Sequence, residues 1–383
     1  MSGARPGPTP PVCVGVIQDV LIIGGTGVFG QRLVRHLSQV DGITLHVASR
    51  SKAKAEAFVR TIAKTSTRLS AVALDRDVNL QAVLQEIKPF VVVDCSGPFQ
   101  AQGYEAARMV LEAGAHLIDL ADARAYLAGF KGALDDVARQ FQVTALTGAS
   151  STPTLSTCVV NHVTKGWQRI ESIDICITPG GKSAVGRSVI EAILSYAGKP
   201  VPIWENGRLL DTTGWRNGQM VVMPGLGHRR VAAVETFDAE YLGPRLDVRS
   251  RVSFSAGLEP RIEQWGIETL AALRSRGWVG SLAGLIPLLL KARTLTRITT
   301  SDSGGMLVDV CGLNTMGDAA QIKWSLVAHQ DHGPNIPILP AAAAIKTLLQ
   351  GGVPMGAGFA HEVIDLHQIM EEMTGYAIEV LGA

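Results

Sequence analysis

A cluster of glycines between an apolar run and a helical pattern constrains the fold of this chain more than any other feature. Residues 21–37 read LIIGGTGVFGQRLVRHL, with four glycines in seven positions directly after a strand candidate. The pattern G-x-G-x-x-G in this context allows a tight turn, a close approach of backbone to a pyrophosphate, and close helix–strand packing. The free N–H groups at the helix start would then face the phosphates. The dinucleotide-binding residues predicted here are Gly25, Thr26, Gly27, Val28, Phe29 and Gly30.

The end of the second predicted strand indicates which dinucleotide is bound. An NAD-preferring protein usually has Asp or Glu about 20 residues after the glycines, where it holds the ribose 2′-OH. Here the chain reads HVASRSKAK, with no acid before Glu56. The guanidinium of Arg50 and the hydroxyls of Ser49 and Ser51 suit a 2′-phosphate, so NADP is favoured over NAD. The alternative for Arg50 is a solvated charge at a helix start.

From Asp19 to about Val163 the chain alternates between apolar strands and helices, which predicts an α/β fold with a Rossmann-type, doubly wound parallel sheet. The strands are continuously apolar, as in a sheet that is covered on both faces. The strand candidates are Val20–Ile23, Thr44–Ala48, Ala71–Ala73, Phe90–Asp94, His116–Asp119 and Val143–Leu146. The helix candidates are Phe29–Leu37, Lys52–Ala63, Asn79–Ile87, Tyr104–Ala113 and Ala125–Gln140.

The residue pattern changes after residue 163, where stretches such as ESIDICI alternate apolar and polar residues. Such alternation indicates antiparallel strands with one half-polar face, so we expect a second, α+β domain with a largely antiparallel or mixed sheet. Helical patterns return near Pro340 and predict C-terminal helices that pack back on the first domain. The expected division is a disordered tail at 1–17, the Rossmann domain at 18–150, a substrate or dimerisation domain at 151–336, and the helices at 337–383.

Charge and cysteine usage exclude several classes. The net charge of +1 over 383 residues argues against nucleic-acid binding, which needs a basic surplus on one face. Five scattered cysteines without a C-x-x-C pattern favour reduced thiols in a cytoplasmic protein, with no metal site. The N-terminal stretch lacks the apolar region of a signal peptide. The apolar run Trp278–Leu290 is too short to cross a bilayer, which takes about 20 residues. We expect it to be a buried helix or hairpin, with peripheral lipid or partner contact as the alternative.

Two further strand ends contribute to the predicted cofactor site, because ligands of such sheets bind beyond the carboxyl ends of the strands. Asp75 follows the third strand, on the adenine side. The fourth strand ends in a turn of small residues that lets backbone touch the ribose and nicotinamide. The residues of that turn are Ser96, Gly97, Pro98 and Phe99.

Long stretches resemble the saccharopine dehydrogenase-like oxidoreductases. The resemblance is carried by DCSGPFQAQGYEAARMVLEAGAHLIDLADA, TGASSTPTLSTCVVNH, SYAGKPVPIWENGRLLDTTGW and GPNIPILPAAAAIKTLLQGG, and it therefore extends over nearly the whole chain. It implies an NAD(P)-binding Rossmann domain, a second α+β domain, a returning C-terminal helix and often a homodimer. The chemistry that it implies is formation or cleavage of a C–N bond through an imine.

Candidates for the chemistry follow the fifth and sixth strands. Asp119 or Asp122 could balance an iminium or hold a substrate amine, and Arg124 could pair with a substrate carboxylate; the alternative is a capping Asp beside a surface Arg. Ser151 and Thr152 suit the start of a helix whose donors face the crevice, although capping alone explains them. Two cations of the second domain are further substrate-binding candidates, namely Lys182 and Arg187.

Several local sequences come close to other functional motifs but lack a required residue or spacing. The sequence GASST is not the G-x-S-x-G of a hydrolase, and CITPGGKS has Cys176 where a phosphate-binding loop needs Gly. His361 and His367 have the wrong spacing for a zinc motif. The HQDH stretch, with His329, Asp331 and His332, fits a polar loop better than a metal site, and His332 could donate a proton if the loop reaches the cleft.

The sequence therefore predicts an NADP-dependent oxidoreductase that acts on a small molecule, through a C=N or C=C bond of a carboxylate-bearing substrate. Two alternatives remain. One is an enoyl-type reductase on a lipid-like substrate, and the other is a non-catalytic NADP-binding regulator that has kept the fold.

Overall fold

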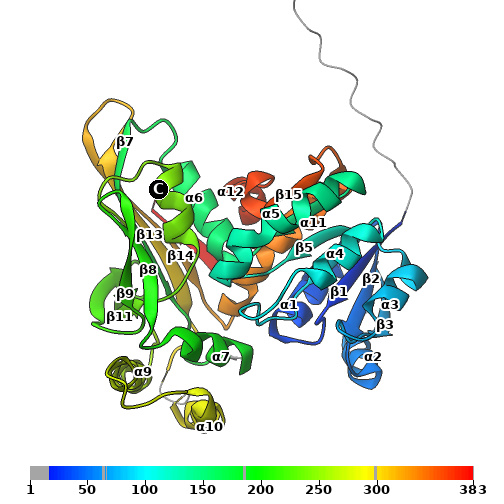
Figure 1. Ribbon diagram of the computed structural model, residues 1–383, viewed down its shortest axis with the longest axis horizontal. Helices are drawn as coiled ribbons and strands as arrows, with labels where there is room; N and C mark the ends of the chain where they lie inside the picture. The colour runs from blue at the N-terminus through cyan, green and yellow to red at the C-terminus, as the bar shows by residue number, and fades with distance from the viewer. Residues whose placement is uncertain (1–16, 63–64, 66, 184–186, 297–299, 383) are drawn as a thin grey trace, which may run out of the picture.

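The computed structural model describes residues 17–62, 65, 67–183, 187–296 and 300–382, without the side chains of 187–189 and 292–295. The described residues form two sheets that lie on opposite sides of the molecule, with the helices α6 (Ser156–Val163), α11 (Leu339–Gln350) and α12 (Leu366–Glu371) between them (Figure 1). Because each sheet has its own helices and apolar face, the predicted two-part α/β and α+β fold is confirmed.

The first sheet contains seven parallel strands in the described part of the chain, and its central strands are buried on both faces. Strand order changes direction between β1 and β4, and at such a point in a doubly wound sheet a ligand crevice opens. In order across the sheet the strands are β15 (Gly356–Phe359), β6 (Thr144–Thr147), β5 (His116–Asp119), β4 (Val91–Asp94), β1 (Gln18–Ile23), β2 (Ile43–Ser49) and β3 (Arg68–Ala73).

Five helices connect these strands and match the sequence prediction closely. In α1 the residues Gly30, Leu33, Val34 and Leu37 are buried, which is the spacing of an amphipathic helix on a sheet. The connecting helices are α1 (Val28–Leu37), α2 (Lys52–Arg60), α3 (Leu80–Ile87), α4 (Glu105–Glu112) and α5 (Arg124–Gln140).

The second sheet is mixed: among its described strands β12 pairs parallel with β7, and the remaining pairs are antiparallel. Its strands are β7 (Arg169–Thr178), β8 (Pro200–Glu205), β9 (Arg208–Thr213), β10 (Gln219–Met223), β11 (Gly227–Ala233), β12 (Arg251–Ala256), β13 (Gly304–Leu313), β14 (Ala319–Ala328) and β16 (Ile378–Leu381). Its other helical segments are η1 (Ser151–Leu155), α7 (Arg187–Tyr196), α8 (Asp238–Arg245), α9 (Arg261–Ser275), η2 (Ala283–Leu285), α10 (Ile286–Thr296) and η4 (Gly333–Ile338).

The C-terminal segment belongs to both sheets, whereas the sequence predicts helices alone. Strand β15 pairs with β6, and β16 pairs with β14. The helix α11 contacts α1 and β5, while η5 (Ala360–Glu362) and α12 follow β15. Residues 356–359 read GAGF, which is too short and too rich in glycine to show the periodicity of a strand.

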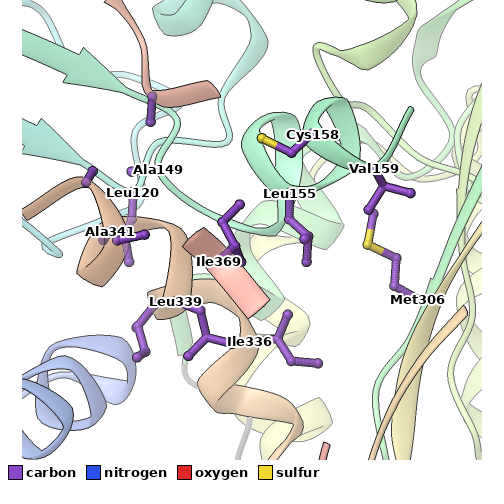
Figure 2. Close-up of a cluster of buried hydrophobic side chains, with 14 of the residues drawn as sticks. Leu120, Ala149, Leu155, Cys158, Val159, Met306, Ile336, Leu339, Ala341 and Ile369 are labelled. Atoms are coloured by element: carbon purple, nitrogen blue, oxygen red, sulfur yellow. The ribbon is translucent and has the colours of Figure 1, made fainter. Parts of the chain in front are cut away.

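Figure 2 shows how segments that are distant in sequence form one core between the sheets. Leu120 comes from the first domain, Leu155, Met306 and Ile336 from the second, and Ile369 from the C-terminal segment. These five side chains are at most 8% exposed. A shared core of this kind holds the two sheets in one arrangement, because separating them would expose all of these apolar side chains to water.

A buried ion cluster strengthens the same junction. The carboxylate of Glu372 lies 2.6 Å from Nε2 of His36 on α1 and accepts a hydrogen bond of 2.8 Å from Nζ of Lys346 on α11. Burial opposes ionisation of Glu372, but His36 and Lys346 outweigh it and lower its pKa. The C-terminal segment is thereby held against the first domain.

The apolar run at 278–290 is not the buried helix or hairpin that the sequence predicts. It forms η2 and the start of α10, in which Leu282 and Ile286 are buried but Trp278 and Leu288 are 73% and 63% exposed. Leu282 and Ile286 are four positions apart and therefore lie on the same face of a helical turn, whereas the other faces of this short segment are left in water. Among the described residues, no helix combines the length and the apolar character that crossing a membrane requires.

His361 of η5 should make the stability of the protein sensitive to acid. It is 8% exposed and stacks on Phe359, and among the described residues neither ring nitrogen has a hydrogen-bond partner. Burial, with a smaller contribution from Arg245, lowers its pKa to about 3. The unfolded chain takes up a proton near pH 6.5, so stability is full above that pH and is lost as the pH falls toward 3.

We therefore expect His361→Phe to lose about 2 kcal/mol less stability than the parent protein between pH 6.5 and 5, in chemical unfolding at each pH. His367→Phe, whose parent side chain is 81% exposed, is the matched control and should follow the parent protein. Equal pH dependence in the parent and His361→Phe would contradict the assignment.

Candidate functional site

A cleft of about 790 Å³ lies beyond the carboxyl ends of β1, β2 and β4 and is closed on its other side by the second domain. Its volume is within the range of roughly 300–1,000 Å³ that is common for cofactor clefts. The first domain contributes the glycine loop, the end of β2 and the turns after β3 and β4. The second domain and the C-terminal third contribute Ser151, Thr152, Ile177, Ala192, Ile193, Tyr196 and Pro337.

The glycine loop presents bare backbone to this cleft. Helix α1 begins after Gly27, and among the described residues no side chain forms a cap hydrogen bond there. By contrast, α2 begins with Ser51, whose hydroxyl accepts from Lys54 N at 3.3 Å. The first N–H groups of a helix have no acceptor within the helix. At α1 these donors, near Val28 and Phe29, border the cleft and suit an anionic ligand such as a diphosphate.

Two glycines of the loop are required by close contacts. A Cβ at Gly30 would overlap the carbonyl oxygen of Gly24 and would lie 2.7 Å from Gly25 Cα. A Cβ at Gly25 would lie 2.8 Å from a methyl group of Val47. The helix therefore packs directly against the end of the strand. The loop between them carries no side chain at these two positions, which leaves room for a ligand in the cleft.

The far end of the cleft carries the positive charges expected near a 2′-phosphate. Arg50 is exposed and lines the cleft together with Ser49, whose hydroxyl accepts a hydrogen bond of 3.1 Å from Thr26. Lys54 also lines it and adds a cation that sequence analysis did not include among the site residues. Ser51 does not line the cleft, because its hydroxyl caps α2.

Arg76 organises the adjoining turns, and the sequence alone did not indicate it. Its Nη1 donates to Asp94 Oδ2 at 3.0 Å, to Gln102 Oε1 at 2.7 Å and to Ser96 Oγ at 3.3 Å. The predicted residue Asp75 lines the cleft beside it, as do Ser96, Gly97, Pro98 and Phe99. Arg76 could not be found by pattern, because its partners are 18 to 26 positions away.

The three candidates for the chemistry are placed very differently. Asp122 is exposed and lines the cleft, and the protein that surrounds it there raises the pKa of its carboxyl. Asp119 is 1% exposed and does not line the cleft; its Oδ1 accepts from Thr147 Oγ1 and from the N–H groups of Gly148 and Ala121 at 2.8–3.0 Å. Burial raises its pKa to about 7, and its contacts give it a role in positioning the turns. Arg124 lies outside the cleft lining as well, in an ion pair of 3.0 Å with Glu240 on α8.

The second domain brings a tyrosine that sequence reasoning missed. Tyr196, at the end of α7, lines the cleft, and burial raises its pKa with a further contribution from the charge of Asp122. Ser151 and Thr152 also line the cleft, and the expected side-chain cap of the following helix is absent among the described residues. Lys182 is exposed in the segment between β7 and α7 and does not line the cleft. The side chain of Arg187 is not described.

The histidines of the HQDH loop, His329 and His332, make hydrogen bonds with neighbouring segments of the second domain and the C-terminal segment. Ser303 Oγ lies 2.9 Å from Nδ1 of His329, and Nδ1 of His332 accepts from Ala377 N at 2.7 Å. His332 does not line the cleft, so it is not placed as a proton donor. Over the described ranges no group of three or more His, Cys, Asp or Glu side chains is arranged to hold a metal ion.

Residues 20–148, which include the glycine loop, match the family model described as "Saccharopine dehydrogenase NADP binding domain". The match confirms the resemblance identified from the sequence for the domain that forms one side of the cleft. No curated protein sequence matches the chain significantly.

Solved structures with a related arrangement include an engineered D-amino acid dehydrogenase bound to NADP+, which is 14% identical with a TM-score of 0.48 over 92% of this chain and 95% of that one. A meso-dapdh mutant with DAP from Clostridium tetani E88 is 13% identical with a TM-score of 0.45 over 93% and 98%. GenD2 from gentamicin A biosynthesis, in complex with NAD, is 10% identical with a TM-score of 0.45 over 100% and 99%. Similarity at this level carries no argument about substrate or cofactor preference.

The placement of Arg50 leads to a test of coenzyme preference. We expect Arg50→Ala to weaken NADPH binding about 10- to 100-fold, because a charge-assisted hydrogen bond contributes about 1.5–3 kcal/mol, and to leave NADH binding nearly unchanged. Titration of coenzyme fluorescence measures both affinities. Arg60→Ala, at the exposed far end of α2, is the matched control. An equal loss for both coenzymes would contradict a 2′-phosphate contact.

Proposed function

We propose that the protein is an NADP-dependent oxidoreductase that transfers a hydride to or from the C=N bond of a carboxylate-bearing substrate. The observation that carries the proposal is the uncapped start of α1, beside Gly27 and next to the cations Arg50 and Lys54, in a cleft of cofactor size. When bound, the coenzyme supplies the hydride, so the protein has to orient the substrate and handle one proton.

Asp122 and Tyr196 are the groups best placed to handle that proton. They come from opposite sides of the cleft, and each has a raised pKa that keeps its proton at higher pH than usual. An acid of this kind can protonate the nitrogen of a substrate or, once ionised, can hold a substrate amine. We assign the proton transfer to Asp122 and a positioning role to Asp119.

Binding of a substrate carboxylate is assigned to Lys182, which precedes α7 in the sequence, and to Arg187, which begins α7. Arg124 is not retained in this role, because its guanidinium already pairs with Glu240. These assignments, together with a homodimeric assembly and a cytoplasmic location, are proposals.

An enoyl-type reductase on an apolar substrate is the second candidate. It is favoured by an apolar side chamber of about 170 Å³ that shares Val28, Phe29 and Ile177 with the cleft. NADPH oxidation measured against imines formed from 2-oxo acids and amines, and against enoyl thioesters, separates the two. Turnover of the enoyl compounds alone would replace our proposal, and tight NADPH binding with no turnover of either class would favour a non-catalytic regulator.

For the substrate class that is turned over, we expect Asp122→Asn to lower kcat about 100-fold, which is the smaller end of what general acid catalysis contributes. In the parent enzyme the protonated form is active, so the rate should fall as the pH rises through the pKa of Asp122. The variant should lose this part of the pH–rate profile. Asp136→Asn, on the exposed side of α5, is the matched control. An unchanged profile in Asp122→Asn would assign the proton to another group.

A further inference from the structure

The side chamber next to the cleft has walls that are almost entirely apolar or backbone. Its volume is about 170 Å³, and it lies between the start of α1, the segment η4 and the strands β7 and β13. It shares Val28, Phe29, Ser151, Ile177 and Pro337 with the cleft, so the two spaces are continuous. Because the chamber opens into the cleft, a group of a ligand bound in the cleft can enter it.

Small residues on η4 leave the chamber open. Gly333, Pro334 and Pro337 form its wall there, and a Cβ built on Gly333 would meet no heavy atom within 4 Å apart from its chain neighbours. The glycines of the opposite strand have another cause: a Cβ on Gly304 would lie 2.5 Å from Gly180 N, and one on Gly305 would overlap the carbonyl oxygen of Leu326. Gly333 is therefore a wall position at which a side chain can be added without a clash at its Cβ.

The remaining wall combines packed core side chains with Pro179 and the polar residues Ser151, Thr178 and Ser183. Met306 and Ile336 are 2% and 8% exposed and belong to the core that Figure 2 shows between the sheets. The hydroxyl of Thr178, which also borders the chamber, already donates to Sδ of Met223 at 3.2 Å. Because the core holds these walls in place, the chamber has a defined shape.

We propose that this chamber is a specificity pocket that binds an apolar group of the substrate, of about the size of a benzene ring. An apolar cavity of about 150 Å³ stays free of water and binds benzene, so a chamber of similar size and lining suits an aryl or branched alkyl group of about six carbon atoms. The inference rests on the proposed function for the identity of the main ligand. It adds that the substrate carries an apolar group that reaches from the cleft into the chamber through the wall that the two spaces share.

Benzene itself is the probe for the pocket, since its binding requires no turnover. In protein with 13C-labelled methyl groups and saturating NADP+, benzene should shift the signals of Met306 and Ile336 in a saturable way. Gly333→Leu should weaken this binding about tenfold or more by filling the chamber. Gly132→Leu is the matched control, because its site on α5 is exposed and also has no neighbour within 4 Å of a new Cβ. Absence of the shifts in the parent protein would overturn the proposal.

A second variant covers the case in which Gly333→Leu fails to fold. Ile336→Ala enlarges the chamber, so it should accept naphthalene, which the parent protein should exclude or bind at least about tenfold more weakly. Equal binding of naphthalene by the parent protein and by this variant would count against a pocket of defined size.

Coenzyme titration keeps the two hypotheses apart. If the parent protein binds NADPH but benzene does not reach Met306 and Ile336, the pocket is refuted and the proposed function stands. If benzene binds in the chamber and neither reduced coenzyme binds to the protein, the proposed function fails, and so does the assignment of the chamber to an oxidoreductase substrate.

Discussion

The contact of α1 with the turn after β1 is the constraint on which the rest of the site depends. Gly30 brings the helix so close to Gly24 that no side chain fits between them, and Gly27 leaves the helix start without a side-chain cap among the described residues. The helix dipole and its unpaired N–H groups are thereby aimed into the cleft. A larger residue at position 30 would move α1 outward, and the proposed diphosphate site would move with it.

The polar networks around the cleft are arranged to hold backbone rather than to react. Arg76 ties the turns after β3 and β4 together through Asp94, Gln102 and Ser96, and Asp119 holds the turn after β6. Such hydrogen bonds are well suited to fix a loop, because breaking any one of them leaves a buried polar atom unpaired. Asp122, which is open to the cleft, is free of this role.

The C-terminal segment decides how the two halves of the cleft face each other. It adds β15 to the first sheet and β16 to the second, and Ile336, before β15, and Ile369, between these strands, belong to the shared core. The ion cluster of Glu372 with His36 and Lys346 adds a polar anchor to α1. One consequence is that η4, which forms a wall of the apolar chamber, is held by the same core that joins the sheets.

The sequence by itself determined the Rossmann domain, the glycine loop and the positions of Arg50 and Asp122 at strand ends, because these depend on local periodicity and on the rule that such sheets bind ligands at their carboxyl ends. It could not separate Asp119 from Asp122, which differ only in what surrounds them, nor show that Arg124 is paired with Glu240, 116 positions later. Tyr196, Arg76, strand β15 and the apolar chamber were decided by the tertiary structure alone. Each of them depends on long-range packing, which brings together residues that carry no local pattern.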